Sequence, residues 1–412
     1  MQKDQEGDAG NRATAARGRG DGVRARARIA LAVVALTGLG TAGLSLSPSG
    51  ARAADQQASH SGKPGLLAPS AALFATPSAL LTPSAPPAPW APHAPAAPGT
   101  LVSGGADQSD PFLTVASGRY LLLTSGGTGS RPVNVPVATS TDFVHWTDPV
   151  DALPVLPDWA QPGFTWAPDL HRFGSRFALY FTAMLKSHAP QTECIGSAFA
   201  GSPTGPFTAQ PRPIICQIDQ GGSIDPRVFV NSDGTPWMLW KSDQNIGGSP
   251  TPTKMWSQRL SPGGAALLGR PSFLMAPDEP WQGTIVEAPD MVEVRGTYWV
   301  IYSANWYNQP AYGVGAARCA GPAGPCRDQT PNPLLASNSQ GEGPGEASAF
   351  HDDTGVWMLY SPWRSLAPKP DFPPRPVYIT RLDFTPQGPY LAPGPLPSAA
   401  DLLGRPFWLP AS

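Results

Sequence analysis

Five acidic residues stand ahead of short apolar runs at nearly regular intervals along the chain. Each is followed by an apolar segment, a turn that contains Gly and an aromatic-rich run; the five are Asp110, Asp169, Asp225, Glu287 and Glu346. Their spacings are 59, 56, 62 and 59 residues. Carboxylates gathered in one place bind cations, hold polar ligands such as sugars, or carry out acid/base chemistry. These side chains can do such chemistry only if the fold brings them together.

Hydrolysis of a glycoside with inversion is one reaction that such a cluster could perform. It needs an ionised carboxylate that activates water and a protonated carboxyl that donates to the leaving oxygen, about 6.5–9.5 Å apart. A third carboxylate near the acid helps to keep it protonated, because like charges resist joint ionisation. Asp110, Asp225 and Glu287 could fill these three roles.

An all-β, five-bladed β-propeller would place these acids around one axis. Residues 101–412 divide into five units of about 62 residues, and each unit has room for four short strands, as in a propeller blade. Equivalent positions of successive blades ring the central channel, so an acid at the start of each inner strand joins a cluster at one end. The alternative is an irregular β-sandwich whose hairpins are similar by accident, and the near-constant spacing disfavours it.

Four motifs resemble those of glycoside hydrolase family 43. They are "SDPF" at 109–112, "WAPDLH" at 166–171, "SIDPRVFVNSDG" at 223–234 and "EAPDM" at 287–291. The resemblance implies a five-bladed propeller that inverts configuration at pentose glycosides. It also implies Asp110 as general base, Glu287 as general acid, and Asp225 as the residue that raises the acid's pKa and orients it. Asp169 resembles a structural or substrate-contacting acid of the second blade.

The fifth repeat departs from the family pattern. Many members carry "GPGH", whose histidine helps to hold a central ion, often calcium, or a water cluster, whereas this chain has "GPGEAS" at 343–348. Glu346 stands where the histidine would be. A carboxylate is a good ligand for a hard cation, so Glu346 is a candidate metal ligand for a structural Ca²⁺, but it could equally change the pH dependence or abolish the ion. No cofactor is expected to be required. His351 is expected at a surface hairpin.

Aromatic side chains near the acids are candidates for stacking on the apolar faces of sugar rings. Phe112, Trp166 and Trp306 follow or flank the lead acids, although each could equally be a packing residue. Arg375, in "PPRPVYI", resembles a family position at which an arginine faces the pocket.

Composition supports a turn-rich β protein and argues against several other functions. Charged residues make up 14% of the 412-residue chain, with 52 Pro and 44 Gly, and the net charge is −2. Nothing therefore suggests a nucleic-acid partner. The sequence has no G-x-S-x-G nucleophile elbow, no phosphate-binding G-x-x-x-x-G-K-[ST] and no H-E-x-x-H zinc motif.

The N-terminal region predicts export. Arginines precede an apolar stretch at 29–46, and "ARA" at 51–53 is a small-x-small cleavage site, which favours a signal peptide at 1–53 over a short membrane anchor. Residues 54–100 are dominated by Ala, Pro and Ser and are expected to form a disordered linker, with partial wrapping near Trp90 as the alternative. The catalytic domain is then 101–412. The mature protein is expected to be secreted, extracellular, monomeric and free of the membrane.

Four cysteines fit an exported protein with two disulfides. Three pairings are open, and the shortest loops favour Cys194–Cys216 and Cys319–Cys326. A zinc site would need closer C-x-x-C spacing, which is absent.

The function expected from these features is a secreted inverting glycosidase of plant cell-wall pentose polymers or their oligosaccharides. Arabinosyl substrates are favoured slightly over β-xylosyl ones, on family prevalence alone. Two alternatives stay open. One is a non-catalytic carbohydrate-binding propeller, and the other is a five-bladed propeller that acts on fructosides with retention and has its carboxyls about 5–5.5 Å apart.

Overall fold

The computed structural model describes residues 99–103, 107–126, 133–186, 188, 190–352, 355–365 and 374–392. The predicted signal peptide and nearly all of the predicted linker lie outside these residues. Thr100, which was counted in the linker, is the first residue of a strand. In the part of the chain that is described, no helix is long and apolar enough to cross a membrane.

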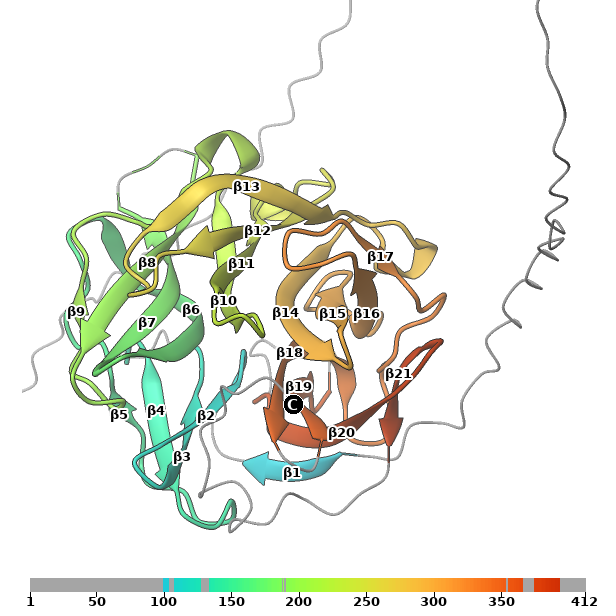
Figure 1. Ribbon diagram of the computed structural model, residues 1–412, viewed down its shortest axis with the longest axis horizontal. Coiled ribbons are helices and arrows are strands. Elements are labelled where there is room, and N and C mark those ends of the chain that lie inside the picture. The colour runs from blue at the N-terminus through green and yellow to red at the C-terminus, as the bar shows by residue number, and fades with distance from the viewer. Residues whose placement is uncertain are drawn as a thin grey trace, which may run out of the picture. The chain divides into compact units, whose positions relative to one another are not determined.

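The predicted all-β, five-bladed propeller is confirmed. Each blade is an antiparallel sheet whose strands follow one another in sequence from the inside outward (Figure 1). Blades 1 and 2 are β2 (Phe112–Ala116), β3 (Arg119–Leu123), β4 (Pro136–Ser140) and β5 (Val150–Asp151), then β6 (Ala160–Phe173), β7 (Arg176–Leu185), β8 (Glu193–Ala200) and β9 (Thr208–Ala209). Blades 3 and 4 are β10 (Ser223–Val230), β11 (Pro236–Ser242), β12 (Lys254–Leu260) and β13 (Leu267–Met275), then β14 (Val286–Val294), β15 (Thr297–Ala304), β16 (Gly313–Cys319) and β17 (Cys326–Asp328).

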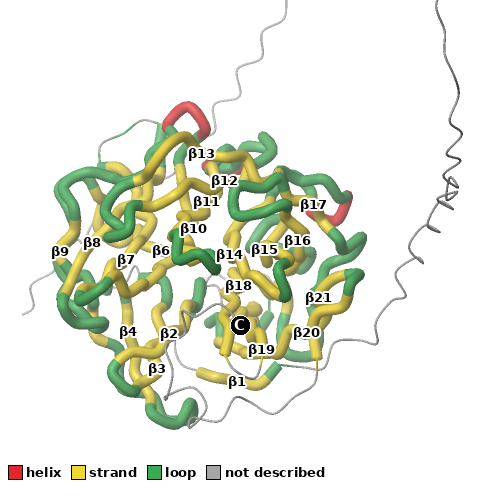
Figure 2. Tube along the Cα trace, viewed as in Figure 1, coloured by secondary structure: helices red, strands yellow, loops and turns green. Residues whose placement is uncertain are grey.

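Blade 5 combines strands from both ends of the described chain. Its first three strands are β18 (Glu342–Asp352), β19 (Gly355–Trp363) and β20 (Val377–Thr385). Its fourth position is shared by β1 (Thr100–Ser103), which pairs with the start of β20, and β21 (Gly388–Ala392), which pairs with its end. The N-terminal strand thus closes the ring. Within the described residues, three short 3₁₀ helices lie in the loops (Figure 2): Ile218–Gln220, Ile246–Gly248 and Pro280–Gln282.

The core is divided into five apolar clusters, and each lies between two neighbouring blades. Leu121 of blade 1 packs with Phe181 of blade 2, for example, and Leu239 of blade 3 packs with Val300 of blade 4. Both faces of each sheet are therefore covered, which explains the near-continuous apolar runs in these strands. At about 25 cal/mol per Å² of buried apolar area, this contact between blades is the main force that holds the ring closed.

The same backbone irregularity recurs in or just before the inner strand of each blade. At that place one non-glycine residue has a φ between 48° and 56°, a conformation uncommon for residues with a Cβ; these residues are Asp110, Ala167, Asp225, Ala288 and Glu346. In blades 2 to 5 the pairing register with the second strand shifts at this residue, as in a β-bulge. Bulges re-aim side chains, so the propeller presents five such positions at one end of its channel.

Hydroxyls of the preceding blade hold three of these irregular positions. The backbone N–H of Ala167 donates to Ser125 Oγ at 3.2 Å, that of Asp225 to Thr182 Oγ1 at 3.2 Å, and that of Glu346 to Ser303 Oγ at 2.9 Å. Each hydroxyl lies in or just after the second strand of its blade. The bulges are thus fixed by their neighbours and are not free to relax.

The five predicted lead acids do not all occupy this position. Asp110, Asp225 and Glu346 do, but Glu287 lies one residue before Ala288 and Asp169 lies two residues after Ala167. The assumption that all five acids occupy equivalent positions was therefore wrong for blades 2 and 4. The offset decides where the side chains of Glu287 and Asp169 point.

Both disulfides join the cysteine pairs favoured from loop length. Cys194 at the second residue of β8 is bonded to Cys216, and Cys319 at the end of β16 is bonded to Cys326 at the start of β17. The second bond links residues that are direct partners in the sheet.

Candidate active site

Four carboxyl side chains from four blades meet at one end of the channel. Asp110 precedes β2, while Asp225, Glu287 and Glu346 lie near the starts of β10, β14 and β18, the innermost strands in Figure 1. The pKa of Asp225 responds to Glu287 and Asp110, and that of Glu346 to all three other acids, which places the group within electrostatic reach of one another. The fold therefore builds the acidic cluster that the spacing predicted.

Glu287 is nearly buried, with 7% of its surface exposed, and both of its oxygens are engaged. Lys241 Nζ donates to Oε2 at 2.8 Å, and the Tyr312 hydroxyl lies 2.7 Å from Oε1. The carboxyl is thus held in one orientation by residues of blades 3 and 4.

Asp225 lies beside Glu287 and is tied to the same strand. The backbone N–H of Ala288 donates to Asp225 Oδ2 at 3.0 Å. Burial raises the pKa of Asp225 to about 7; the Lys241 ammonium opposes this rise, and Glu287 and Asp110 add to it. Its protonation therefore changes near neutral pH, together with that of its neighbours.

Asp110 differs from the other three because it is only partly buried. The Ser125 hydroxyl donates to Asp110 Oδ2, and the same Ser125 oxygen accepts from the Ala167 N–H. The first acid is thereby positioned against blade 2 while it remains accessible at the channel mouth.

Glu346 is buried against Tyr312, whose hydroxyl contacts Glu346 Oε1. Burial, followed by the charges of Asp110, Asp225 and Glu287, raises the pKa of Glu346 well above its ordinary value, and the Arg375 guanidinium opposes this. In the described residues no group of three or more His, Cys, Asp or Glu side chains could hold a metal ion. The predicted role of Glu346 as a calcium ligand does not fit this site, and we derive no step through a metal.

Lys241, Asp243 and Glu193 belong to the cluster although sequence reasoning missed them. Lys241 has 1% exposure, and its Nζ also lies 3.3 Å from Asp243 Oδ1. Burial lowers the pKa of Lys241, but Glu287, Asp243 and Asp225 outweigh this and raise it. Burial also raises the pKa of Glu193 to about 8, with a further contribution from Asp243. One lysine in the otherwise apolar run "PWMLWKS" was the available indication.

The predicted sugar-stacking residues differ in exposure. Phe112 is 7% exposed and packs in the core between blades 1 and 2, with the Arg227 guanidinium 5.0 Å from its ring centroid, so it acts as a packing residue. Trp166 and Trp306 are partly exposed. The Trp166 side chain hydrogen-bonds Glu193, so it borders the cluster. Trp306 lies in the loop after β15.

Arg375 and Tyr307 lie on the blade 5 side of the site. Arg375 is 3% exposed; its Nη2 donates to the Ser361 carbonyl at 2.8 Å and its guanidinium stacks on Trp363. Its charge reaches Glu346 and Tyr307. Tyr307 is 47% exposed, and its pKa is raised by burial and further by Glu287 and Asp110. This tyrosine, which sequence reasoning missed, is an aromatic ring at the mouth.

Asp169 has no exposed surface, so it does not contact a substrate as the binding expectation required. Its oxygens accept from the Val228 N–H at 3.3 Å and lie 3.5 Å from Arg227 Nη1. Arg227 Nε in turn lies 3.5 Å from Asp290 Oδ2. The bulges explain this arrangement, because Asp169, Arg227 and Asp290 all lie two residues beyond the irregular position. They form a buried Asp–Arg–Asp layer that links blades 2, 3 and 4.

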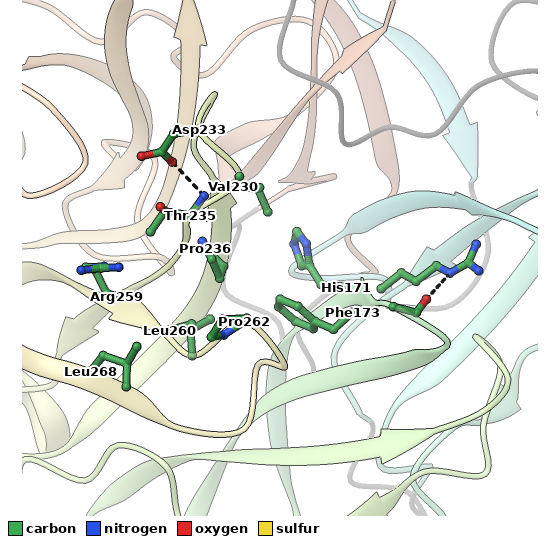
Figure 3. Close-up of a pocket in the computed structure, with 13 residues that line it drawn as sticks. His171, Phe173, Val230, Asp233, Thr235, Pro236, Arg259, Leu260, Pro262 and Leu268 are labelled. Atoms are coloured by element: carbon green, nitrogen blue, oxygen red, sulfur yellow. Dashed lines mark hydrogen bonds between the residues drawn. The ribbon is translucent and has the colours of Figure 1, made fainter.

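A separate cavity of about 460 Å³ lies at the other ends of β6 and β10 (Figure 3). It is lined by Phe173, Val230, Asp233, Arg259 and Leu268, among others, and Asp233 accepts from the Thr235 N–H at 2.8 Å. None of the carboxyl cluster contributes to it.

Comparison with known proteins agrees with this architecture. The model of glycosyl hydrolases family 43 matches residues 104–390. Xylosidase/arabinosidase 43A of Humicola insolens is 40% identical over 75 residues, which are 18% of this chain and only about a fifth (21%) of that protein. Extracellular endo-alpha-(1->5)-L-arabinanase 1 of Bacillus subtilis is 24% identical over 260 residues, which cover 57% of this chain and 75% of that protein.

A solved structure of a thermostable family-43 glycoside hydrolase superposes with a TM-score of 0.62 at 25% identity, covering 73% of this chain and 98% of that one. The family model spans more than half of the sequence and includes all five blades. The chain is therefore a glycoside hydrolase that belongs to family 43.

Proposed function

We propose that the protein is a secreted, inverting hydrolase of pentose glycosides in plant cell-wall polysaccharides or their oligosaccharides. The observation that carries the proposal is the meeting of Asp110, Asp225 and Glu287 from three blades at one channel end, where only Asp110 is partly exposed. An accessible carboxylate and an enclosed one on different blades suit attack by water on one face and departure of the leaving group on the other.

In the proposed reaction Asp110 is the general base. It takes a proton from a water molecule as that water attacks the anomeric carbon, and its contact with Ser125 fixes its orientation. Glu287 is the general acid and gives a proton to the glycosidic oxygen as the carbon–oxygen bond breaks. Asp225, held by the Ala288 N–H beside Glu287, controls where the proton rests, because two neighbouring carboxyls resist joint ionisation.

The substrate class is proposed from the relatives. One is named as a xylosidase and arabinosidase, and another as an endo-acting arabinanase. We propose α-L-arabinosyl substrates first and β-xylosyl substrates second. Trp166 and Tyr307 offer aromatic surface near the acids for a pentose ring.

Secretion is part of the proposal. The predicted cleavage after Ala53, the two disulfides and the extracellular relative support it. N-terminal sequencing of the protein recovered from culture medium tests it, with a first residue of Ala54 as the expected result.

Activity on arabinan, arabinoxylan and aryl pentosides, with and without a chelator, tests the substrate class. We expect hydrolysis that the chelator leaves unchanged. Proton NMR of the first-formed product reads the stereochemistry, and an inverted anomer is expected. Net retention would exclude the inverting mechanism and favour a retaining fructoside-type enzyme; binding without turnover would favour a carbohydrate-binding propeller.

A further inference from the structure

The Tyr312 hydroxyl lies between two carboxyl groups. Its oxygen is 2.7 Å from Glu287 Oε1 and also contacts Glu346 Oε1, and all three side chains are buried. A tyrosine hydroxyl has one proton and can donate only one hydrogen bond. The other contact is a hydrogen bond only if that carboxyl carries a proton and donates to the tyrosine oxygen.

The surroundings identify the protonated partner. Glu287 Oε2 accepts from the Lys241 ammonium at 2.8 Å, so Glu287 is the partner without a proton once it has given its proton to a leaving group. The carboxyl of Glu346 faces Asp110 of blade 1, Asp225 of blade 3 and Glu287 of blade 4, with Arg375 of blade 5 as the opposing cation. Burial among these acids raises the pKa of Glu346 well above its ordinary value. The chain of donors therefore runs from Glu346 through Tyr312 to Glu287.

We propose that Glu346 and Tyr312 form a proton relay that reloads Glu287 between turnovers. The inference rests on the proposed inverting function. Each inverting cycle leaves the general acid without its proton and the general base with an extra one, so both must be reset. In the relay, the Glu346 carboxyl proton passes to the tyrosine oxygen while the tyrosine proton passes to Glu287. No bond between heavy atoms changes, and the negative charge moves from Glu287 to Glu346.

Glu346 then recovers a proton from the base side of the site. Among the neighbouring charges, that of the ionised Asp110 acts most strongly on Glu346. Once Asp110 holds the proton taken from water this charge is gone, and the proton must leave Asp110 before the next cycle. The relay thus accounts for the reloading of Glu287.

Two substitutions interrupt the relay in different ways. Tyr312→Phe removes the hydroxyl, and Glu346→Gln keeps a group that can donate to Tyr312 but cannot release a proton. The matched control is Tyr298→Phe, because the Tyr298 hydroxyl also has a side-chain partner, Asn231 Oδ1 at 2.8 Å, but lies at the start of β15, far along the strand from Ser303.

The experiment compares the first turnover with later ones on an arabino-oligosaccharide. For both relay variants we expect a first-turnover rate within about twofold of wild type. At low buffer concentration, their steady-state kcat should be lower than that of wild type by about 10-fold. Added imidazole or acetate should restore kcat. KM should fall together with kcat in the variants and kcat/KM should stay unchanged, because the slowed step follows product formation. An aryl pentoside with a strongly acidic phenol, which needs no acid, should turn over at the wild-type rate. Tyr298→Phe should behave as wild type throughout.

Equal losses in the first and later turnovers, without buffer rescue, would show that Tyr312 and Glu346 only hold Glu287 in place. Unchanged steady-state rates in both variants would exclude the relay. Failure of the proposed function is seen separately, because it would appear as retention or lack of turnover in the wild-type protein.

Discussion

The two ends of strand β14 carry the same side chain in different surroundings. Glu287, at the second residue, is nearly buried and engaged by Lys241 and Tyr312. Glu293, six residues later, is partly exposed and lies opposite Tyr298 next to the hairpin. Residue type and strand are shared, so the difference comes from which end of the blade the side chain occupies.

Strand β10 repeats this contrast. Burial raises the pKa of Asp225 at its start to about 7. Asp233, in the hairpin that follows its end and beside the cavity of Figure 3, has its pKa lowered by the backbone N–H and the hydroxyl of Thr235. The start of β10 therefore holds a buried carboxyl that titrates near neutral pH, while the hairpin at its end holds an exposed carboxylate. Acid/base chemistry is available only at the first.

The most direct test of this contrast is Glu287→Gln beside Glu293→Gln. Removal of a general acid costs about 10²–10⁴-fold in rate, so Glu287→Gln should lower kcat by this factor on unactivated glycosides with an unchanged fold. Glu293→Gln should keep wild-type kcat. Steady-state kinetics and thermal melts of both variants give the answer, and comparable activity of the two would contradict the assignment.

Arg227→Met tests the buried layer that lies between the two ends. The substitution removes the guanidinium that Asp169 and Asp290 share, while His171 Nε2 still lies 3.4 Å from Asp169, and breaking a buried pair costs about 3–5 kcal/mol of unfolding free energy. Burial raises the pKa of Asp290 to about 7, above its unfolded value of 3.8, so its contribution to stability is present below pH 3.8 and lost as pH rises through 7. The deficit of the variant should therefore shrink in acid.

Arg381→Met is the matched control for that experiment. Arg381 pairs with Asp383 at 2.8 Å, but both side chains are about one-third exposed, and such a pair is worth about 0–1 kcal/mol. Urea unfolding of both variants at several pH values measures the two costs. A similar cost for both would mean that the Asp–Arg–Asp layer does not stabilise the ring.

Asp225→Asn beside Asp233→Asn sharpens the contrast within β10 and its hairpin. Asn cannot exchange a proton with Glu287, so Asp225→Asn should lower kcat about 10²-fold, with a changed pH–rate profile between pH 6 and 8 where Asp225 titrates. Asp233→Asn should leave the profile and kcat unchanged. Profiles of kcat/KM against pH check this, and a wild-type profile in Asp225→Asn would argue against its role.

Glu193→Gln should have the smallest effect on kcat, and its main effect should appear in the melting temperature. The pKa of Glu193 rises from 4.5 to about 8 on folding, so its contribution is present below pH 4.5 and lost as pH rises through 8. The variant should have the same melting temperature as wild type near pH 4.5. Near pH 8.5 its melting temperature should be higher than that of wild type, by roughly 3 °C for each kcal/mol of unfavourable free energy that the substitution removes. Asp233→Asn should show the opposite trend, because a lowered pKa stabilises at high pH. Parallel melting curves would contradict the raised pKa.

The blades were predictable from sequence because the same local structure recurs in or just before each inner strand. The spacing of the acids indicates the repeat, but it does not show which residue of each repeat occupies the equivalent structural position. In four blades the irregular residue precedes a proline, as in Asp110-Pro111 and Ala167-Pro168. Alignment of the repeats on this residue–proline step would have shown that Asp169 lies two residues beyond the irregular position, at the place that Asp290 occupies in blade 4.

The rest of the site depends on contacts between blades, which spacing cannot reveal. Lys241, Glu193 and Tyr312 come from second or later strands or the loops beside them, and their approach to Glu287 follows from how far each blade turns relative to the next. The fate of Glu346 was equally hidden, because its partner Tyr312 lies 34 residues away in a different blade.

The strand that closes the ring has a consequence for the order of folding. β1 is synthesised before every other strand of the propeller, but its partner β20 is among the last, and the Gly99–Gln340 contact beside it spans 241 residues. At about 5–20 residues per second, β1 is synthesised many seconds before β20, so its hydrogen-bonding edge can be paired only after blades 1 to 4 have been made. Ring closure is therefore a long-range step that joins the two ends of the described chain.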